Sequence, residues 1–266
     1  MARLHLNEGG YHGERIDLPE TEMAILEAAS KKGWQLESRT WKPGAPAIHF
    51  LQRLGGGHRR IYLSAGMHGD EPAPLLAVRA LLESDQWPDG TDLFLCPCLN
   101  PEGVQLGTRT NADGIDINRD YRHLRTREAA QHVAWLEKCG PFDLSLCLHE
   151  DWEAHGFYLY ELNPDQRPSL AAAMIESAGQ FCPIDHSPLI DGRETNAPGL
   201  IRPSFDPTSR PEWPEAIWLL THNSKLGYTL EAPSDWPLQE RVQALIAAVH
   251  TGLDTWRSSV SADSVG

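Results

Sequence analysis

The stretch Leu63-Ser-Ala-Gly-Met-His-Gly-Asp-Glu-Pro72 decides the fold that we predict for this chain. It begins in a short apolar run, 61–63, turns at Gly66, and then presents His68 and Glu71. An imidazole and a carboxylate can hold the same cation, but a zinc ion takes three or four ligands. The pair alone is therefore an incomplete metal site, and by itself it also fits an ordinary surface turn.

The surroundings of this pair favour a site over a turn. Residues 61–65 predict a buried strand, and the segment from Pro72 to Leu82 has proline near its start and apolar residues at helical spacing. The pair thus lies where a strand is followed by a helix that packs on the sheet. In open α/β sheets, ligands bind at the ends of strands next to such crossovers.

Apolar periodicity predicts further elements on both sides of this unit. The three glycines at 55–57 predict the turn of a hairpin that leads into the strand at 61–65. Residues 183–215 are rich in proline, and no chemistry is assigned to them. We expect helices at 21–32, 168–180 and 238–256, strands within 34–54 and at 93–99, 142–149, 156–162, 217–221 and 226–231, a turn at 100–103 and a frayed tail at 258–266.

Length and charge limit the classes of protein to be considered. A chain of 266 residues with 41% hydrophobic residues can form one large domain, so we expect a single domain over 1–266. The net charge of −14 would repel phosphate backbones and anionic lipids, which disfavours nucleic acid and membrane surfaces as partners. The first ten residues lack the apolar core of a signal peptide, and no long apolar run occurs. We therefore expect a soluble, cytoplasmic protein.

The five cysteines form an odd, scattered set, mostly in apolar surroundings where a reduced thiol behaves as a small hydrophobic side chain. Cys96 and Cys98 are two residues apart and could bind a metal ion. However, the sequence has no matching second pair, so we interpret all five as structural thiols.

A long polar segment, 105–121, follows the strand expected at 93–99. A loop of this length inside a compact domain is more often functional than idle. Four segments occur in order along this part of the chain: His68-Gly-Asp-Glu71, Asn100-Pro-Glu-Gly103, Gly107-Thr-Arg-Thr-Asn111 and Gly114-Ile-Asp-Ile-Asn-Arg119. Their order and spacing resemble the zinc carboxypeptidase superfamily, which includes carboxypeptidases, murein-peptide amidases, and deacylases such as succinylglutamate desuccinylase and aspartoacylase. The resemblance covers about residues 60–235, and the first 55 residues match nothing that we can name.

The resemblance implies the remaining ligand and its support. The family has a histidine at the end of a later strand, and His149 closes the apolar run 142–149. Two histidines and Glu71 would hold one zinc ion per chain and leave a position for water. Asp116 would accept a hydrogen bond from the His68 ring and fix its tautomer, although an aspartate in such a loop can also serve only its own turn.

A glutamate in a late strand is also expected in the family, and Glu231 ends the apolar run 226–231. A buried carboxylate is costly, and its raised pKa would suit a general base that takes a proton from water and gives it to the leaving amine. A salt bridge to a loop arginine is the structural alternative. No tyrosine occurs in 201–212, where pancreatic enzymes carry one that closes over the substrate.

The same resemblance gives roles to the polar loop. Arg109 would stabilise the developing oxyanion, and Asn118 with Arg119 would bind a substrate carboxylate, because the planar guanidinium matches it bidentately. The alternative interpretation is that Arg109 and Arg119 are ordinary charged residues of a loop exposed to solvent. Asp120 follows where relatives often have a neutral or aromatic residue, so it could favour a substrate with a cationic group.

These observations predict an α/β fold with a mixed, mostly parallel twisted sheet and helices on both faces. The predicted activity is that of a zinc metallopeptidase of the carboxypeptidase type, which hydrolyses an amide or peptide bond next to a free carboxylate. A zinc deacylase or amidase of small N-acyl amino acids or murein peptides is the alternative. A substrate-binding relative without turnover is a third reading, against which the complete set of catalytic residues argues.

Overall fold

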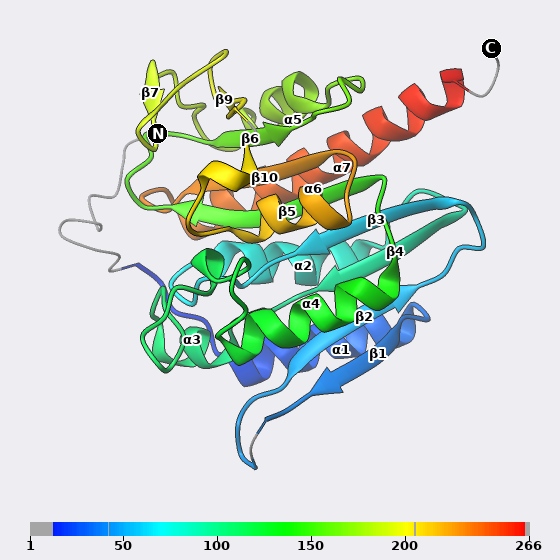
Figure 1. The fold of residues 1–266 in the computed structure, drawn as a ribbon, viewed down its shortest axis with the longest axis vertical. Coiled ribbons are helices and arrows are strands. Elements are labelled where there is room, and N and C mark those ends of the chain that lie inside the picture. Colours follow the sequence, from blue (N-terminus) through cyan, green and yellow to red (C-terminus); the bar gives the residue numbers. More distant parts are fainter. Residues whose placement is uncertain (1–12, 42, 205, 264–266) are drawn as a thin grey trace.

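An eight-stranded sheet runs through the middle of the molecule (Figure 1). The structure is a computed structural model, and it describes residues 13–41, 43–204 and 206–263. The strands are β1 (Gln35–Arg39), β2 (Ile48–Arg53), β3 (Arg59–Ser64), β4 (Thr91–Cys96), β5 (Leu144–Asp151), β6 (Tyr158–Leu162), β9 (Leu200–Ile201) and β10 (Gly227–Pro233), and β7 (Leu189–Ile190) with β8 (Arg193–Glu194) forms a separate two-stranded sheet. The helices are α1 (Leu18–Lys31), α2 (Pro72–Ser84), α3 (Pro101–Leu106), α4 (Arg127–Cys139), α5 (Ala171–Ala178), α6 (Glu215–His222) and α7 (Leu238–Asp263), with short 3-10 turns η1 (Ile117–Arg119) and η2 (Pro207–Ser209).

The strand order in the large sheet is β1-β2-β4-β3-β5-β10-β6-β9. The four central strands, from β4 to β10, are parallel to one another, and antiparallel pairs flank them on both sides. Because the central strands are parallel, their carboxyl ends meet at one edge of the sheet. The predicted mixed, mostly parallel sheet is confirmed.

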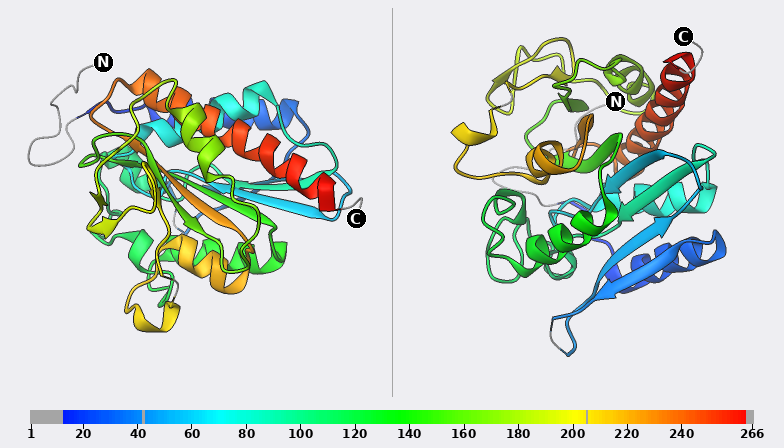
Figure 2. Two further views of the ribbon diagram at one scale, coloured as in Figure 1. Left: turned by 90° about the horizontal axis from the view of Figure 1, so that it is seen from above. Right: turned by 45° about the vertical axis from the view of Figure 1, so that its right-hand side comes forward.

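Helices cover both faces of this sheet (Figure 2). Side chains from α1, α2, α5 and α7 form one apolar cluster with one face, and side chains from α4 and α6 form a second cluster with the other. The strands supply both clusters because successive side chains point to opposite faces: Leu63 lies in the first cluster and Tyr62 in the second. None of the described helices combines the length and the apolar character that spanning a membrane requires.

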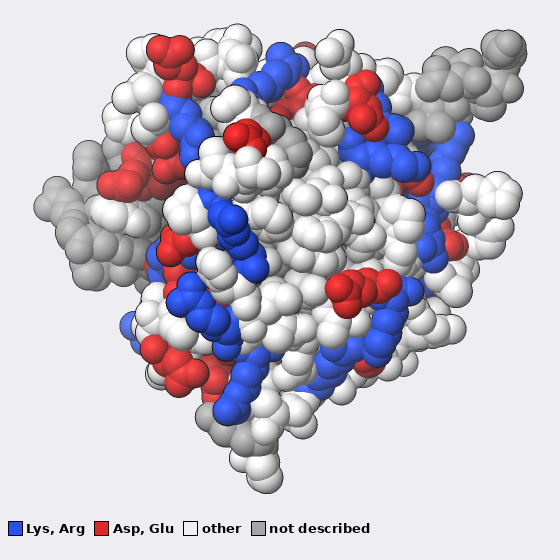
Figure 3. Space-filling view, in the orientation of Figure 1, with Lys and Arg blue, Asp and Glu red and all other residues white. Residues whose placement is uncertain are grey.

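The surface in Figure 3 carries both signs of charge. Basic and acidic side chains are interspersed over the face shown, and neither sign covers it as one continuous patch. The excess of acidic residues in the chain is therefore not gathered on this face.

The hairpin predicted at residues 55–57 is wrong. β2 pairs with β4, which separates it from β3, so the loop does not join neighbouring strands. The glycines are needed for a close approach instead: a Cβ at Gly57 would lie 1.7 Å from the carbonyl oxygen of Gly90. The backbone N–H of Gly55 also donates to Asp92, at 3.0 Å.

The strand predicted at 217–221 is also wrong, because these residues lie in helix α6. A short apolar run cannot be assigned by periodicity alone, and Pro214 with Glu215 before it is a typical helix start. The turn expected at 100–103 is the beginning of helix α3, with Asn100 as its cap. Helix α4 was not anticipated.

Both ends of the described chain contain regular secondary structure. Helix α1 and strands β1 and β2 agree with the helix expected at 21–32 and the strands expected within 34–54, and residues within the first 55, which the family resemblance does not cover, thus build one edge of the sheet and part of the cover over it. Helix α7 continues through Asp263, so the tail expected to fray at 258–266 is helical up to that residue. Residues 264–266 lie outside the described part, as do residues 1–12, on which the signal-peptide prediction falls.

A buried ion pair joins helix α7 to the end of strand β5. The side chains of Arg241 and Glu150 are both fully buried and form an ion pair. Glu150 also accepts a hydrogen bond from the backbone N–H of Ala73 at 2.6 Å, and Arg241 reaches Glu14 at 2.5 Å with its other terminal nitrogen. One carboxylate thus connects β5, the first turn of α2 and α7.

This pair gives a test of the packing. Arg241→Met should lower the free energy of unfolding by about 3–5 kcal/mol, because it leaves Glu150 buried without its cation. Adding Glu150→Gln should recover part of that loss, since the amide oxygen still accepts from Ala73 and no charge stays buried. Urea denaturation of the wild type, both single variants and the double variant gives four free energies of unfolding. Their differences yield the coupling free energy between Arg241 and Glu150.

Arg79→Met is the matched control, because Arg79 pairs with Glu83 at 2.8 Å on the exposed side of α2. An exposed pair contributes little, so this variant should change the free energy of unfolding by less than about 1 kcal/mol. If Arg241→Met costs no more than the control, the buried pair does not hold α7 to the sheet.

Candidate metal centre

Three neighbouring strands bring the predicted site residues together. His68 follows β3, His149 lies near the end of β5 and Glu231 near the end of β10, and these strands are adjacent and parallel. Glu231 is directly opposite His149 in the register of β5 and β10, so both side chains leave the same face of the sheet. The topology therefore places side chains from distant parts of the sequence at one edge.

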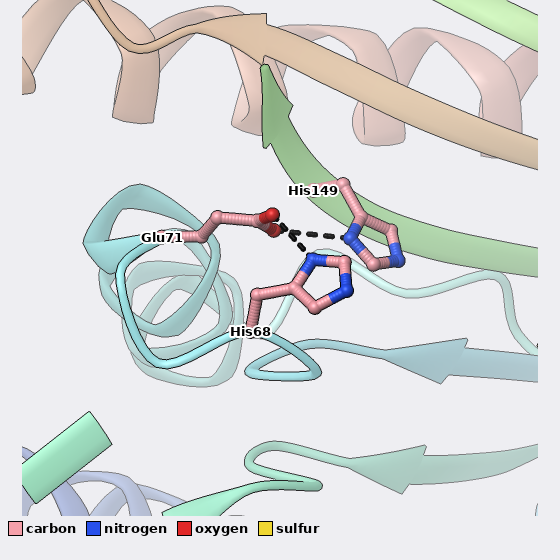
Figure 4. A group of neighbouring side chains, drawn as sticks. All are labelled: His68, Glu71 and His149. Atoms are coloured by element: carbon pink, nitrogen blue, oxygen red, sulfur yellow. Dashed lines mark hydrogen bonds and ion pairs between the residues drawn. The ribbon is translucent and has the colours of Figure 1, made fainter. Parts of the chain in front are cut away.

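The Glu71 carboxylate faces both histidine rings, which lie side by side (Figure 4). Its Oε1 is 2.5 Å from Nδ1 of His68, and its Oε2 is 3.0 Å from Nδ1 of His149. One donor atom from each of the three residues lies within 4.8 Å of the other two, and all three residues are buried. The two ring centroids are 5.0 Å apart.

The electrostatics of this group are those of a buried anion facing two imidazoles. Burial alone would raise the pKa of Glu71, but the charges and hydrogen bonds of His68 and His149 hold it well below its usual value. Burial would lower the pKa of His68, yet Glu71 and Asp116 outweigh it and raise that pKa to about 9. The donor set, two imidazoles and one carboxylate, fits a divalent transition-metal ion.

Asp116 and Arg109 lie next to His68 and Glu71. Nε2 of His68 is 3.2 Å from Asp116, whose other oxygen accepts a hydrogen bond from Nε of Arg109 at 3.1 Å. Nη1 of Arg109 also lies 3.8 Å from Glu71. Burial would raise the pKa of Asp116, but the hydrogen bond to His68 and the charge of Arg109 keep it well below its usual value. Asp116 thus contacts the ring nitrogen of His68 that faces away from Glu71.

Glu231 and the two expected substrate contacts lie in the same cavity. Burial, with the nearby charges of Glu71 and Asp151, raises the pKa of Glu231 well above its usual value, although the charge of His149 opposes this. Asn118 and Arg119 line the cavity from η1. The side-chain oxygen of Asn118 accepts from the backbone N–H of Glu215 at 2.9 Å, which fixes the orientation of its amide.

Asp120 does not line this cavity. It is buried, and its carboxylate accepts a hydrogen bond from the backbone N–H of Thr126 at 2.5 Å, just before helix α4. A carboxylate in this position supports the loop and the start of the helix. Asp120 is therefore not placed to contact a substrate in the cavity, in contrast to its expected role in specificity.

The cavity has a volume of about 560 Å³ and extends beyond the group of His68, Glu71 and His149. Several of its side chains come from the segment 183–215, to which no role was assigned. Pro214 and Glu215 could have indicated a helix start there, but no sequence pattern placed the segment over the site. The lining residues from this segment are Asp191, Arg193, Pro203, Arg210, Pro211, Glu212, Pro214 and Glu215.

A buried polar network lies under one wall of the cavity, and it was not anticipated. The Glu215 carboxylate accepts hydrogen bonds from Tyr62 at 2.7 Å and Ser64 at 2.9 Å. The phenol oxygens of Tyr62 and Tyr121 lie 2.8 and 2.7 Å from the two ring nitrogens of His132. Burial lowers the pKa of His132 to about 3, so the ring is neutral. These contacts hold α4 and α6 against the sheet behind the site.

The loop that carries His68 and Glu71 rests on the start of helix α3. Gly69 donates its backbone N–H to the carbonyl of Thr108 at 2.9 Å. A Cβ at Gly69 would lie 2.0 Å from the carbonyl carbon of Gly103, so no other residue fits without movement. This contact packs the motif at 68–71 against the motif at 100–103.

Comparison with known proteins gives the chain a family context. Residues 58–187 match the model of the succinylglutamate desuccinylase/aspartoacylase catalytic domain. The chain is 33% identical to murein peptide amidase A of Escherichia coli K12 over 92 residues, and 37% identical to murein peptide amidase A of Vibrio campbellii over 81 residues. These matches span 37% and 31% of the two relatives, and 35% and 29% of this chain.

Solved structures resemble the chain over most of its length. A candidate metallopeptidase of Shewanella denitrificans superimposes with a TM-score of 0.77 at 23% identity, covering 90% of both chains. A metallo-carboxypeptidase of Burkholderia cenocepacia gives a TM-score of 0.64 at 17% identity, covering 89% of this chain and 69% of that one. The expected carboxypeptidase-like fold and the resemblance to the zinc carboxypeptidase superfamily are confirmed.

The contact between Gly69 and Gly103 gives a test of the centre. Gly69→Ala should weaken the binding of a divalent cation such as zinc by about 10- to 100-fold, as other changes to the supports of metal ligands do. The new methyl group would displace the loop that holds His68 and Glu71. Competition titration with a chromophoric chelator measures the dissociation constant.

Gly252→Ala is the control, because its Cβ would meet only the flexible side chain of Met174, at 3.1 Å, in helix α7. That variant should bind the cation as the wild type does. Equal affinity of Gly69→Ala and Gly252→Ala would show that the loop geometry does not define the centre.

Proposed function

We propose that this zinc carboxypeptidase-like chain is a zinc-dependent hydrolase that cuts an amide or peptide bond next to a free carboxylate. The observation that carries the proposal is the convergence of His68, Glu71 and His149, with Glu231 opposite His149 in the register of neighbouring strands. These four side chains come from three separate segments and line one cavity. A structural role alone would not need them at the open edge of the sheet.

His68, Glu71 and His149 would hold one zinc ion per chain. Zinc is favoured over other metals because two imidazoles and one carboxylate are the protein ligands of a catalytic zinc site with an open position. When bound, zinc lowers the pKa of water and polarises a carbonyl group. Asp116 would keep the His68 ring in the required orientation, since it already contacts Nε2 at 3.2 Å.

Glu231 would act as the general base and then as the general acid. Its raised pKa suits both steps, because the carboxylate can take a proton from water and return it to the leaving amine. Arg109 would donate to the developing oxyanion, and its contact with Asp116 at 3.1 Å holds the guanidinium at the cavity wall.

The substrate carboxylate would bind to Asn118 and Arg119. The amide of Asn118 is held by Glu215, and the guanidinium of Arg119 lies in the same wall, with Nη1 donating to the carbonyl of Asn118 at 2.9 Å. A planar guanidinium matches a carboxylate in two hydrogen bonds. The free carboxylate would thus set the distance between the scissile amide and the metal centre.

The alternative is a deacylase or amidase that acts on a small N-acyl amino acid or a murein peptide. It is favoured by the matches to murein peptide amidases and to the desuccinylase/aspartoacylase domain, whereas the carboxypeptidase reading is favoured by the solved structures. A carboxypeptidase and a deacylase or amidase would use the same residues of this chain, and they would differ in the amide that is cut. The cytoplasmic location stays a prediction, supported by five cysteines that are all buried and unpaired, the usual state in a reducing compartment.

Two variants test the proposal. Purified wild-type protein should contain one zinc ion per chain, His149→Ala should lose it, and Glu231→Gln should keep it. Glu231→Gln should nevertheless lower kcat by about 10²- to 10⁴-fold, the usual contribution of a general base. Elemental analysis and turnover are measured in parallel on C-terminal peptides, murein tripeptide, N-acetylaspartate and succinylglutamate.

Two controls make the result specific. Glu83→Gln, on the exposed side of α2, should retain both zinc and activity, and a substrate whose free carboxylate is converted to an amide should be cut much more slowly. Activity that survives complete removal of the metal, or that persists in Glu231→Gln, would overturn the proposed mechanism.

A further inference from the structure

The proposed general base, Glu231, has a cross-strand neighbour on each side. In the register of the sheet it lies opposite His149 of β5 and opposite Tyr158 of β6, so the three side chains leave the same face in one row. Strands β5, β10 and β6 are adjacent in this order (Figure 1). Directly opposite residues of an antiparallel pair, such as Glu231 and Tyr158, have Cβ atoms about 4.5–5.5 Å apart. The Tyr158 ring therefore forms one side of the space that Glu231 occupies.

Tyr158 is held in place by Asp151. Its phenol donates a hydrogen bond to Oδ2 of Asp151 at 2.9 Å, and Oδ1 of the same carboxylate accepts from the backbone N–H of Glu153 at 2.8 Å. Tyr158 is buried, and its ring belongs to a small apolar cluster beside the cavity. Asp151 pairs with Pro233 in the register of β5 and β10, two residues beyond Glu231. The bond from Tyr158 to Asp151 thus joins β6 to β5 and spans the intervening strand just past Glu231.

The next tyrosine of β6 has a different neighbour and a different partner. Tyr160 lines the same cavity, but in the register of the sheet it lies opposite Thr229. Its phenol donates a hydrogen bond to Asp191, which connects β7 to β8. The rings of Tyr158 and Tyr160 meet edge to face, with their centroids 5.7 Å apart. Of these two cavity phenols, Tyr158 is therefore the one that adjoins Glu231.

The partner of the Tyr158 phenol matters for the proposed chemistry. A general base has to lie within hydrogen-bond reach of the water that it deprotonates, with an oxygen free to accept the proton. A phenol next to a carboxylate could donate to it and so occupy one of its oxygens. The Tyr158 phenol donates to Asp151 instead, so the ring can pack beside Glu231 without competing with water. Asp151 lines the cavity, and no step of the proposed mechanism uses it directly.

We propose that Tyr158 and Asp151 are positioning residues for Glu231. The hydrogen bond between them fixes the ring beside which the Glu231 carboxylate packs, and it keeps the phenol turned away from that carboxylate. This inference rests on the proposed function, because the two residues act only through the proposed general base. A catalytic group that moves by about 1 Å can cost about 100-fold in rate, so the bond has a measurable effect even though neither residue contacts the substrate.

Tyr158→Phe tests the proposal, since it keeps the ring and removes only the phenol oxygen. This variant should lower kcat by about tenfold, the effect expected from losing one hydrogen bond to a charged group. KM and the zinc content should stay at their wild-type values, because neither the substrate clamp nor the metal ligands change. Asp151→Asn should lower kcat in the same way: its amide can donate to the phenol oxygen, which frees the phenolic hydrogen. This second variant keeps the test valid if Tyr158→Phe does not fold.

A cycle with Glu231 distinguishes positioning from general support of the fold. If Tyr158 acts through Glu231, Tyr158→Phe should have no further effect on the residual rate of Glu231→Gln, measured in single turnovers. A tyrosine that only supports the fold would lower the rate by the same factor in both backgrounds. Tyr160→Phe is the matched control: it removes a phenol oxygen from the same strand and the same cavity, and it should keep the wild-type kcat.

Crystal structures separate this inference from the proposed function, because they need no turnover. The Glu231 side chain should adopt the same rotamer in wild type and in Tyr160→Phe, and it should shift or occupy several rotamers in Tyr158→Phe and Asp151→Asn. Absence of turnover on every substrate would contradict the proposed function, while the structures still test the positioning. An unmoved Glu231 in both Tyr158→Phe and Asp151→Asn, or an equal loss from Tyr158→Phe in the wild-type and Glu231→Gln backgrounds, would overturn the positioning role.

Discussion

The interaction on which the rest of the structure depends is the pairing of the buried Glu71 carboxylate with two imidazoles. Its oxygens lie 2.5 and 3.0 Å from His68 and His149. A buried carboxylate is costly unless positive charge or hydrogen-bond donors face it. The chain meets this requirement through topology, because β3 and β5 are parallel neighbours whose ends deliver the two rings to the start of α2. The donor atoms of the proposed cation site thereby meet at the open edge of the sheet.

The surrounding contacts keep this arrangement in place. The backbone N–H of Glu150 donates to Glu71 at 3.1 Å, and the Glu150 side chain joins α2 to Arg241 of α7. On the opposite side, Asp116 connects His68 to Arg109. The three side chains are thus supported by helix packing on one side and by the polar loop on the other. Rigid supports of this kind are what a site needs to hold its geometry before the substrate binds.

The sequence predicted most of what depends on local pattern. The apolar run 61–63 and the helix that follows it placed His68 and Glu71 between a strand and a helix, and the family resemblance indicated His149 and Glu231 at the ends of later apolar runs. Contacts between distant segments could not be predicted in this way. The glycines at 55–57 serve an approach to Gly90, and the apolar run at 217–221 is too short for its period to distinguish helix from strand. Residues 183–215 lack regular periodicity, so nothing in the sequence placed Arg193 and Arg210 in the cavity.

Zinc binding by Glu71 and the two histidines at the open edge of the sheet can be seen directly in crystals of the protein purified without chelator, measured on both sides of the zinc absorption edge. We expect an anomalous difference peak within bonding distance of Nδ1 of His68, Nδ1 of His149 and the Glu71 carboxylate, present above the edge and lost below it. A zinc peak elsewhere in the molecule, with these three side chains still hydrogen-bonded to one another, would contradict it.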